Sequence, residues 1–126
     1  MDVRIKLQRM TLFVRSPEEM CAFYTAHFGA RDMGAFSDDV TKDVGVRLRF
    51  PAGMELQLAE DFRKEVPAGG NHLTFLLETR EQVNALTLEL CDAACEVVFG
   101  PFETKRNGYA SCVLDPEGNY IEIMAE

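Results

Sequence analysis

The chain has 126 residues, of which 47% are hydrophobic and 27% are charged, and its formal net charge is −8. This length is typical of one domain with an apolar core, and the negative charge excludes a surface that neutralises nucleic-acid phosphates or an anionic membrane. No apolar stretch reaches membrane-spanning length, and the first residues lack the apolar core of a signal peptide, so we expect a cytoplasmic protein. The four cysteines complete no zinc motif, and we expect them to be small buried hydrophobes.

The first half of the chain reads as one strand, one helix and three strands. Residues 4–14 alternate as a strand does, with Met10, Leu12 and Val14 on one face. Ser16 is a helix cap with Pro17 at the first helical position, and Gly29 ends the helix. Three strands are then predicted at about 30–37, 43–50 and 53–59.

The second half repeats this order after a charged and turn-rich linker at about 61–70. A strand at 71–78 leads into a helix whose capping box is Thr79 with Gln82, and strands near 95–104, 109–115 and 119–125 follow. The sequence therefore predicts an α+β fold of two tandem βαβββ modules, at about 1–60 and 71–126. We expect the two modules to form one domain, 1–126, in which two curled mixed sheets surround a cleft.

Strand parity predicts a polar face on each sheet, opposite the face that the helix covers. This face is too polar for a sealed core, so it is interpreted as the wall of a water-accessible cleft. Because the halves are duplicated, Arg9 and His72 are expected to meet there, as are Gln57 and Glu122. The polar face is predicted to carry Arg9, Glu55, Gln57, His72, Thr74, Tyr120 and Glu122, together with Arg47 and Arg49.

Three segments resemble the vicinal oxygen chelate superfamily, which includes glyoxalase I, extradiol dioxygenases, fosfomycin-resistance transferases and bleomycin-binding proteins. They are residues 11–17 (TLFVRSP) with Phe23-Tyr24, residues 72–75 (HLTF), and residues 115–123 (DPEGNYIEI). The resemblance implies paired βαβββ modules, assembled as a homodimer. It also implies that metal-dependent relatives bind a divalent ion through the first and last strands of each module.

Carried over to this chain, the implied ligand positions fall on Arg9, Gln57 (or Glu55), His72 and Glu122. Arg9 departs from the family pattern, because a guanidinium stays protonated and has no free lone pair. A unit charge about 4 Å from a dication, at an effective dielectric of about 20, is repelled by roughly 8 kcal/mol. We therefore favour no tightly bound metal, with Arg9 pairing with Glu122 in its place.

Three functions follow from these residues. The first is a small-molecule-binding protein without a complete metal site, holding a polar or anionic ligand with Arg9, Gln57, His72, Glu122, Arg47 and Tyr120. The second is a metal-dependent lyase, dioxygenase or thiol transferase that uses His72, Glu122 and Gln57 to hold Zn, Ni, Mn or Fe. The third is metal-free proton transfer, with Glu122 as the candidate catalytic base and Arg9 holding an oxyanion.

Overall fold

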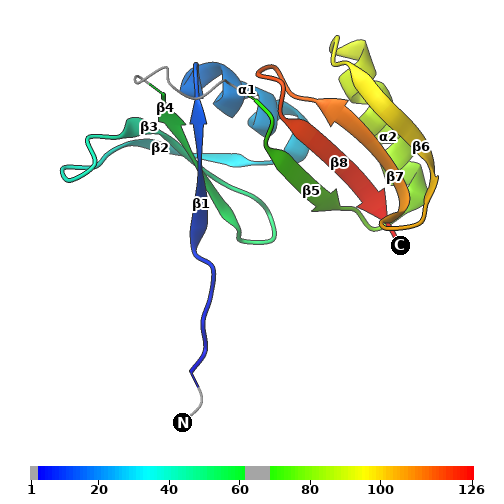
Figure 1. The fold of residues 1–126 in the computed structure, drawn as a ribbon, viewed down its shortest axis with the longest axis horizontal. Coiled ribbons are helices and arrows are strands. Elements are labelled where there is room, and N and C mark those ends of the chain that lie inside the picture. The colour runs from blue at the N-terminus through cyan, green and yellow to red at the C-terminus, as the bar shows by residue number, and fades with distance from the viewer. Residues whose placement is uncertain (1–2, 62–68) are drawn as a thin grey trace. The chain divides into compact units, whose positions relative to one another are not determined.

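The computed structural model describes residues 3–61 and 69–126. It divides into two compact units, Met1–Lys64 and Glu65–Glu126, which are described separately below (Figure 1). The boundary between them falls within the predicted linker, most of which lies outside the described residues. The grouping of both units into one domain stays a prediction.

The first unit is a four-stranded sheet with one helix. Its sheet order is β1-β4-β3-β2, in which β1 pairs with β4 in parallel and the other neighbours are antiparallel. The parallel pair arises because the chain returns through the helix and two strands before β4 joins β1. The elements are β1 (Arg9–Val14), α1 (Pro17–Phe28), β2 (Arg31–Ser37), β3 (Val44–Arg49) and β4 (Glu55–Glu60).

The second unit repeats this plan. Its sheet order is β5-β8-β7-β6, with β5 parallel to β8 and the other pairs antiparallel. The predicted α+β fold of two βαβββ modules is therefore confirmed, and the two mixed sheets are not closed into barrels. The elements are β5 (His72–Leu76), α2 (Arg80–Asp92), β6 (Val97–Thr104), β7 (Gly108–Leu114) and β8 (Tyr120–Ala125).

Both helices begin at the predicted caps. The Ser16 side chain accepts a hydrogen bond from the Glu19 backbone N–H at 3.2 Å. At the start of α2, Thr79 and Gln82 form the complete reciprocal capping box. Helix α1 ends at Gly29, whose φ of 68° is the left-handed conformation that glycine adopts without a steric cost.

Each helix covers one face of the sheet in its own unit. In the first unit Leu12, Leu48 and Leu58 are buried together with Met20 and Tyr24 of α1. In the second, Ile121, Ile123 and Val113 of the sheet and Val83 and Leu90 of α2 are buried. The predicted strand parity is thus confirmed, and it leaves the opposite face of each sheet to polar side chains.

The predicted strand at 4–14 is wrong in its first five residues. β1 begins at Arg9 because β4, its hydrogen-bonded neighbour, begins at the facing residue Glu55. Within the described part of the chain, residues 3–8 belong to no strand, and Figure 1 shows them as an extended segment leading away from the sheet of the first unit. Their apolar members are exposed: Val3 at 68%, Ile5 at 90% and Leu7 at 61%.

The prediction that all four cysteines are buried also needs correction. Cys21 and Cys112 are buried as expected, but Cys91 is exposed and Cys95 is half-buried. The structure also has a buried hydrogen bond that was not predicted, between Thr87 of α2 and Ser111 of β7, whose hydroxyl oxygens lie 2.7 Å apart. The two hydroxyls satisfy each other, so they can lie beneath the helix among apolar side chains.

Candidate functional site

The register of the parallel strand pairs aligns the two modules residue by residue. In the first unit Arg9 faces Glu55 and Thr11 faces Gln57. In the second, His72 faces Tyr120 and Thr74 faces Glu122. Each module therefore places a threonine beside a longer polar side chain on its last strand, and the predicted site residues occupy equivalent positions on the open faces of the two sheets.

In the first unit, Arg47 and Gln57 form the centre of the open face. They face each other across β3 and β4, and an Arg47 Nη2 atom donates a hydrogen bond to Gln57 Oε1 at 2.9 Å. The Gln57 amide nitrogen lies 3.5 Å from the Thr11 hydroxyl oxygen, and the guanidinium carbon of Arg47 lies 5.9 Å from the centre of the Phe36 ring. The Arg47 Nε atom is buried and has no hydrogen-bond acceptor among the described residues.

Arg9 lies beside a carboxylate of its own unit. Its Nε is 4.0 Å from Glu55 Oε1, and Gln8 donates to the other Glu55 oxygen at 3.0 Å. The Glu55 side chain is 14% exposed, so this carboxylate is partly shielded from water. The sequence identified Glu55 as a member of the polar face but gave no indication that it is the partner of Arg9.

In the second unit, Glu122 is a buried carboxylate. It is 6% exposed, so the prediction of a face open to water is wrong at this residue. Arg106 Nη2 donates to Glu122 Oε1 at 3.0 Å, and the Asn107 side-chain amide donates to Oε2. Two donors on one carboxylate offset the cost of removing its charge from water.

The β6–β7 turn positions these two donors. The Thr104 hydroxyl accepts from the Asn107 backbone N–H at 3.1 Å and donates to the Gly108 carbonyl at 2.7 Å. Gly108 has φ 64°, and a Cβ atom there would lie 2.9 Å from the Ala125 carbonyl oxygen. Asn107-Gly108 was predicted as a turn, but the hydrogen bonds of Arg106 and Asn107 to Glu122 were not predicted. The residues of a turn indicate its local conformation and not which distant residues it contacts.

Cys112 lies directly opposite Glu122 on β7. Burial raises the pKa of the Cys112 thiol, and the nearby negative charge of Glu122 raises that pKa further. The neutral form of the thiol is therefore favoured beside the Glu122 carboxylate. The hydrogen bonds from Arg106 and Asn107 hold the Glu122 carboxylate in a fixed position.

His72 stacks on Tyr120. Their ring centres are 4.8 Å apart with an interplanar angle of 24°. His72 is exposed and Tyr120 is half-buried, so the pair presents an aromatic surface with a polar edge to solvent. Both were predicted to be ligand-binding residues, and the structure brings them together.

The side chains at the implied metal positions do not fit a resident divalent ion. Arg9 is a cation, and the Gln57 amide oxygen already accepts from another cation, Arg47. Both oxygens of Glu122 accept from Arg106 and Asn107. The oxygens of Glu55 lie against Arg9 and Gln8, which leaves His72 as the remaining candidate. Across residues 3–61 and 69–126, no three His, Cys, Asp or Glu side chains are grouped so that they could hold a metal ion.

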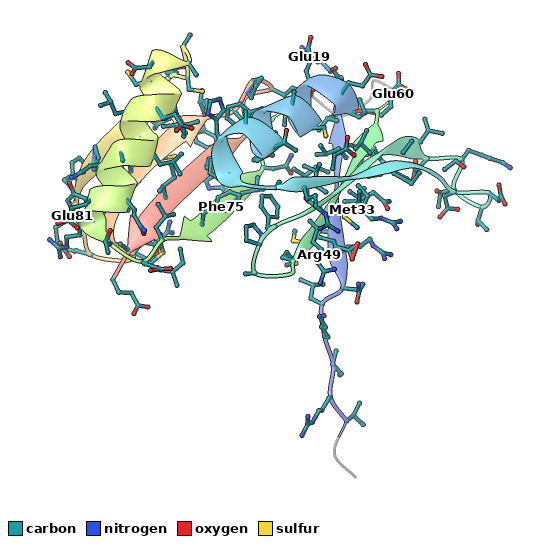
Figure 2. The ribbon with its side chains drawn as sticks, turned by 180° about the vertical axis from the view of Figure 1, so that it is seen from behind. Glu19, Met33, Arg49, Glu60, Phe75 and Glu81 are labelled. Atoms are coloured by element: carbon teal, nitrogen blue, oxygen red, sulfur yellow. The ribbon has the colours of Figure 1, made fainter. Side chains whose placement is uncertain are left out.

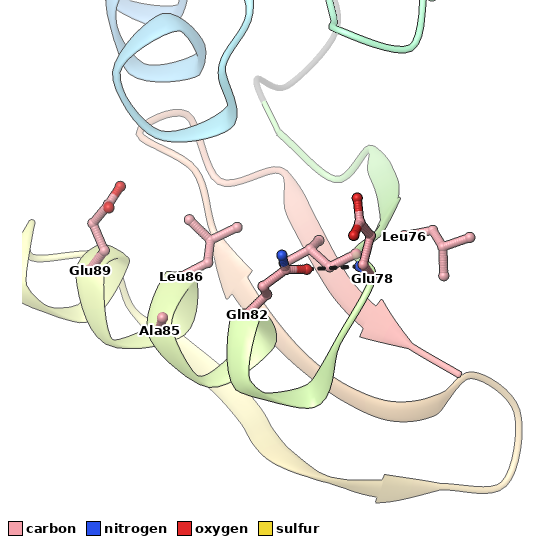
Figure 3. A pocket seen from close by; sticks show the side chains of 7 residues that line it. Leu76, Glu78, Gln82, Ala85, Leu86 and Glu89 are labelled. Atoms are coloured by element: carbon pink, nitrogen blue, oxygen red, sulfur yellow. Dashed lines mark hydrogen bonds between the residues drawn. The ribbon is translucent and has the colours of Figure 1, made fainter.

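A hollow of about 470 Å³ lies in the second unit, between the end of β5 and α2 (Figure 3). Gln82 Oε1 accepts from the Glu78 backbone N–H there at 2.9 Å, as part of the helix cap. It contains none of the predicted site residues, and its polar groups serve the start of α2. Its lining consists of Leu76, Leu77, Glu78, Gln82, Ala85, Leu86 and Glu89.

Comparison with known proteins identifies the family. The model of the Glyoxalase/Bleomycin resistance protein/Dioxygenase superfamily matches residues 6–123, nearly the whole chain. The chain belongs to this superfamily. The resemblance seen in residues 11–17, 72–75 and 115–123 is thereby confirmed, and none of the curated proteins searched matches the chain.

Solved structures of other proteins share the fold. One is a mutant of the fosfomycin resistance protein FosX from Listeria monocytogenes, in complex with Mn(II) and 1S,2S-dihydroxypropylphosphonic acid. It is 20% identical to this chain, the match covers 95% of this chain and 91% of that chain, and the TM-score is 0.71. A candidate glyoxalase from Bacillus halodurans is 25% identical, with 95% of both chains covered and a TM-score of 0.74. An integron cassette protein from V. cholerae is 21% identical, with 99% and 98% covered and a TM-score of 0.70.

The family match and the solved structures therefore agree with the fold of this chain. Some superfamily members bind small molecules or a divalent metal. At this level of identity the ligands named for those proteins remain properties of those proteins. In the part of the chain that the structure describes, neither helix has the length and apolar character needed to cross a membrane.

Proposed function

We propose that this protein binds a polar or anionic small molecule against the open faces of its sheets and does so without a resident metal. The observation that carries the proposal is Arg47, a half-buried guanidinium held by Gln57, whose Nε has no acceptor among the described residues. Buried donors are nearly always satisfied, so this N–H calls for an acceptor that the unit itself does not supply. A carboxylate, phosphoryl or carbonyl oxygen of a ligand would meet that need.

The neighbouring groups support a small, partly aromatic ligand. Phe36 lies beneath the guanidinium of Arg47, and Thr11 and Gln57 offer further hydrogen bonds on the same face. The second unit carries an aromatic pair on its own sheet, His72 stacked on Tyr120. A small number of polar groups set among aromatic side chains is typical of sites that bind small molecules.

Binding and metal dependence are tested together. Chelator-treated protein is titrated calorimetrically with Mn²⁺, Zn²⁺, Ni²⁺ and Fe²⁺, and then with a panel of small carboxylates and phosphonates. We expect no metal binding in the micromolar range and at least one organic anion that binds the metal-free protein. Arg47→Gln should weaken that binding by about tenfold or more, since a charged hydrogen bond is removed. Arg4→Gln, which removes an equal charge outside the sheet, is the matched control.

The result that overturns the proposal is equally definite. Micromolar or tighter metal binding that disappears in His72→Ala would favour the alternative, a metal-dependent lyase, dioxygenase or thiol transferase with His72, Glu122 and Gln57 as ligands. In that case Arg106 and Asn107 would have to release Glu122 when the ion binds. Equal affinities of Arg47→Gln and Arg4→Gln for the bound anion would also reject the proposed site.

We further propose that the protein is a homodimer in the cytoplasm. Homodimers are common in the superfamily, and Ile5 and Leu7, exposed at 90% and 61%, are apolar surface that a second chain would cover. The four free cysteines suit a reducing compartment. Light scattering after size exclusion should give twice the monomer mass, and a monomer mass at micromolar concentration would contradict the dimer.

A further inference from the structure

Two arginines lie directly opposite each other at one end of the first sheet. Arg31 of β2 and Arg49 of β3 are paired in the antiparallel register. Side chains that face each other in such a pair lie on the same side of the sheet, and like charges there are destabilising. Figure 2 labels Arg49 on the side of this sheet away from α1, which agrees with the burial of the adjacent Leu48 beneath the helix.

Neither arginine is neutralised by its own unit. Among the described residues, Arg31 and Arg49 form no ion pair and no side-chain hydrogen bond. Glu55 faces Arg49 across β4, but its two oxygens are directed to Arg9 and Gln8. Asp32, next to Arg31, accepts the Gly34 backbone N–H at 2.8 Å. Two positive charges are therefore placed together while the nearby carboxylates are engaged elsewhere.

The same two arginines line a hollow. Its volume is about 310 Å³, and Phe50, Pro51 and Gly29 form the rest of its wall. An aromatic ring and a proline beside two guanidinium groups suit a molecule with an anionic end and an apolar body. A volume of this size accommodates a small organic molecule.

We propose that this hollow binds a phosphate monoester with a small apolar body. A phosphoryl group carries a charge near −2 at neutral pH and three acceptor oxygens, so it matches two guanidinium groups in charge and in hydrogen bonding. A carboxylate would leave one of the two charges uncompensated. The apolar part of the molecule would lie against Phe50 and Pro51. Arg49 lies two residues from Arg47 on the same face of β3, but neither Arg47 nor Gln57 lines the hollow. The proposal does not depend on the function proposed above.

The test uses three probes with the full-length protein: phenyl phosphate, inorganic phosphate and benzoate, titrated at low ionic strength. We expect phenyl phosphate to bind most tightly, inorganic phosphate more weakly because it lacks the ring, and benzoate most weakly. Arg31→Gln and Arg49→Gln should each lower the affinity for phenyl phosphate by about tenfold or more. Arg4→Gln, which removes an equal charge outside the sheet, should leave this affinity unchanged.

Thermal stability gives a second measurement. In phosphate-free buffer, Arg49→Gln should melt no lower than the wild type, because removing one of two facing charges relieves repulsion. Phenyl phosphate should raise the melting temperature of the wild type and not that of this variant. Equal affinities in Arg49→Gln and Arg4→Gln would overturn the proposal, and so would backbone amide shifts at Gly29 and Phe50 that do not respond to phenyl phosphate in the wild type.

Discussion

Glu122, for which the family resemblance implies a role as a metal ligand, has the surroundings of a structural anion. Its carboxylate is buried on a central strand, and each of its oxygens accepts a hydrogen bond from the β6–β7 turn. Arg106 remains largely exposed, at 79%, so solvent screens its attraction to the carboxylate. The hydrogen bond from the Asn107 amide and the cost of burying the carboxylate therefore affect the free energy of unfolding more than the attraction to Arg106 does.

Replacing Glu122 with glutamine tests this interpretation. The amide keeps one acceptor oxygen but turns an N–H₂ group toward Arg106 or Asn107, so one hydrogen bond is lost and two donors oppose each other. We expect the free energy of unfolding in urea to fall by about 1–3 kcal/mol. Glu103→Gln, which breaks an exposed ion pair with Arg80, should change it by less than about 1 kcal/mol. Equal effects of the two substitutions would show that Glu122 contributes no more than a surface charge.

Cys112 gives a prediction for alkaline pH. Burial, and then the charge of Glu122, raise its thiol pKa above the ordinary value of 9.0. The neutral thiol is therefore favoured in the folded state, and its contribution to stability is complete below that ordinary value. The contribution is lost as the pH rises toward the folded pKa. Between pH 8 and about 10.5, Cys112→Ala should lose less stability than the wild type, measured by urea unfolding at each pH.

Cys91→Ala is the control for this experiment, because Cys91 is exposed. Cys21 and Cys95 also have raised thiol pKa values, caused first by burial. Their thiols will therefore contribute to the fall of the free energy of unfolding with rising pH in every variant. A slope in Cys112→Ala that equals the wild-type slope would contradict a linkage between the Cys112 thiol and folding.

At the scale of elements, the start of α2 depends on a short local motif. Thr79 accepts from the Gln82 backbone N–H at 3.1 Å, and Gln82 accepts from the Thr79 backbone N–H at the same distance. Thr79→Ala removes the first of these bonds, so we expect a loss of about 1 kcal/mol in the free energy of unfolding. Thr79→Ser keeps the hydroxyl and should recover most of the loss. A Thr79→Ala variant as stable as the wild type would mean that tertiary packing alone fixes this helix end.

The elements that could be predicted are those whose signals are local. Ser16, Thr79 and Gly29 mark helix ends through hydrogen bonds and backbone angles within a few residues, and strand alternation assigned the two faces of each sheet. The boundary of β1 could not be predicted, because it depends on where β4, far along the chain, begins to pair. The partners of Glu122 and Arg9 were missed for the same reason: Arg106, Asn107 and Glu55 approach them through tertiary structure.

At the scale of the whole molecule, the duplication extends from the order of elements to single residues. Thr11 with Gln57 repeats as Thr74 with Glu122, and Arg9 with Glu55 repeats as His72 with Tyr120. The modules differ in charge at equivalent positions. The first carries guanidinium groups at Arg9 and Arg47, whereas the second carries His72 and Cys112 there. The first module is thereby more positively charged at these two positions than the second.

Arg9→His would reverse the departure from the family pattern. The substitution removes a cation and supplies a neutral imidazole nitrogen that can ligate a metal. If the superfamily's convergence of positions 9, 57, 72 and 122 holds in this protein, the affinity for Mn²⁺ or Zn²⁺ should rise by at least about tenfold over the wild type, since a repulsion of several kcal/mol is replaced by an attraction. Calorimetric titration measures the rise, and Arg4→His controls for a histidine introduced elsewhere. Combining Arg9→His with His72→Ala should abolish the gain. Equal metal affinities in Arg9→His and Arg4→His would show that the cation of the first strand is not what weakens metal binding in this chain.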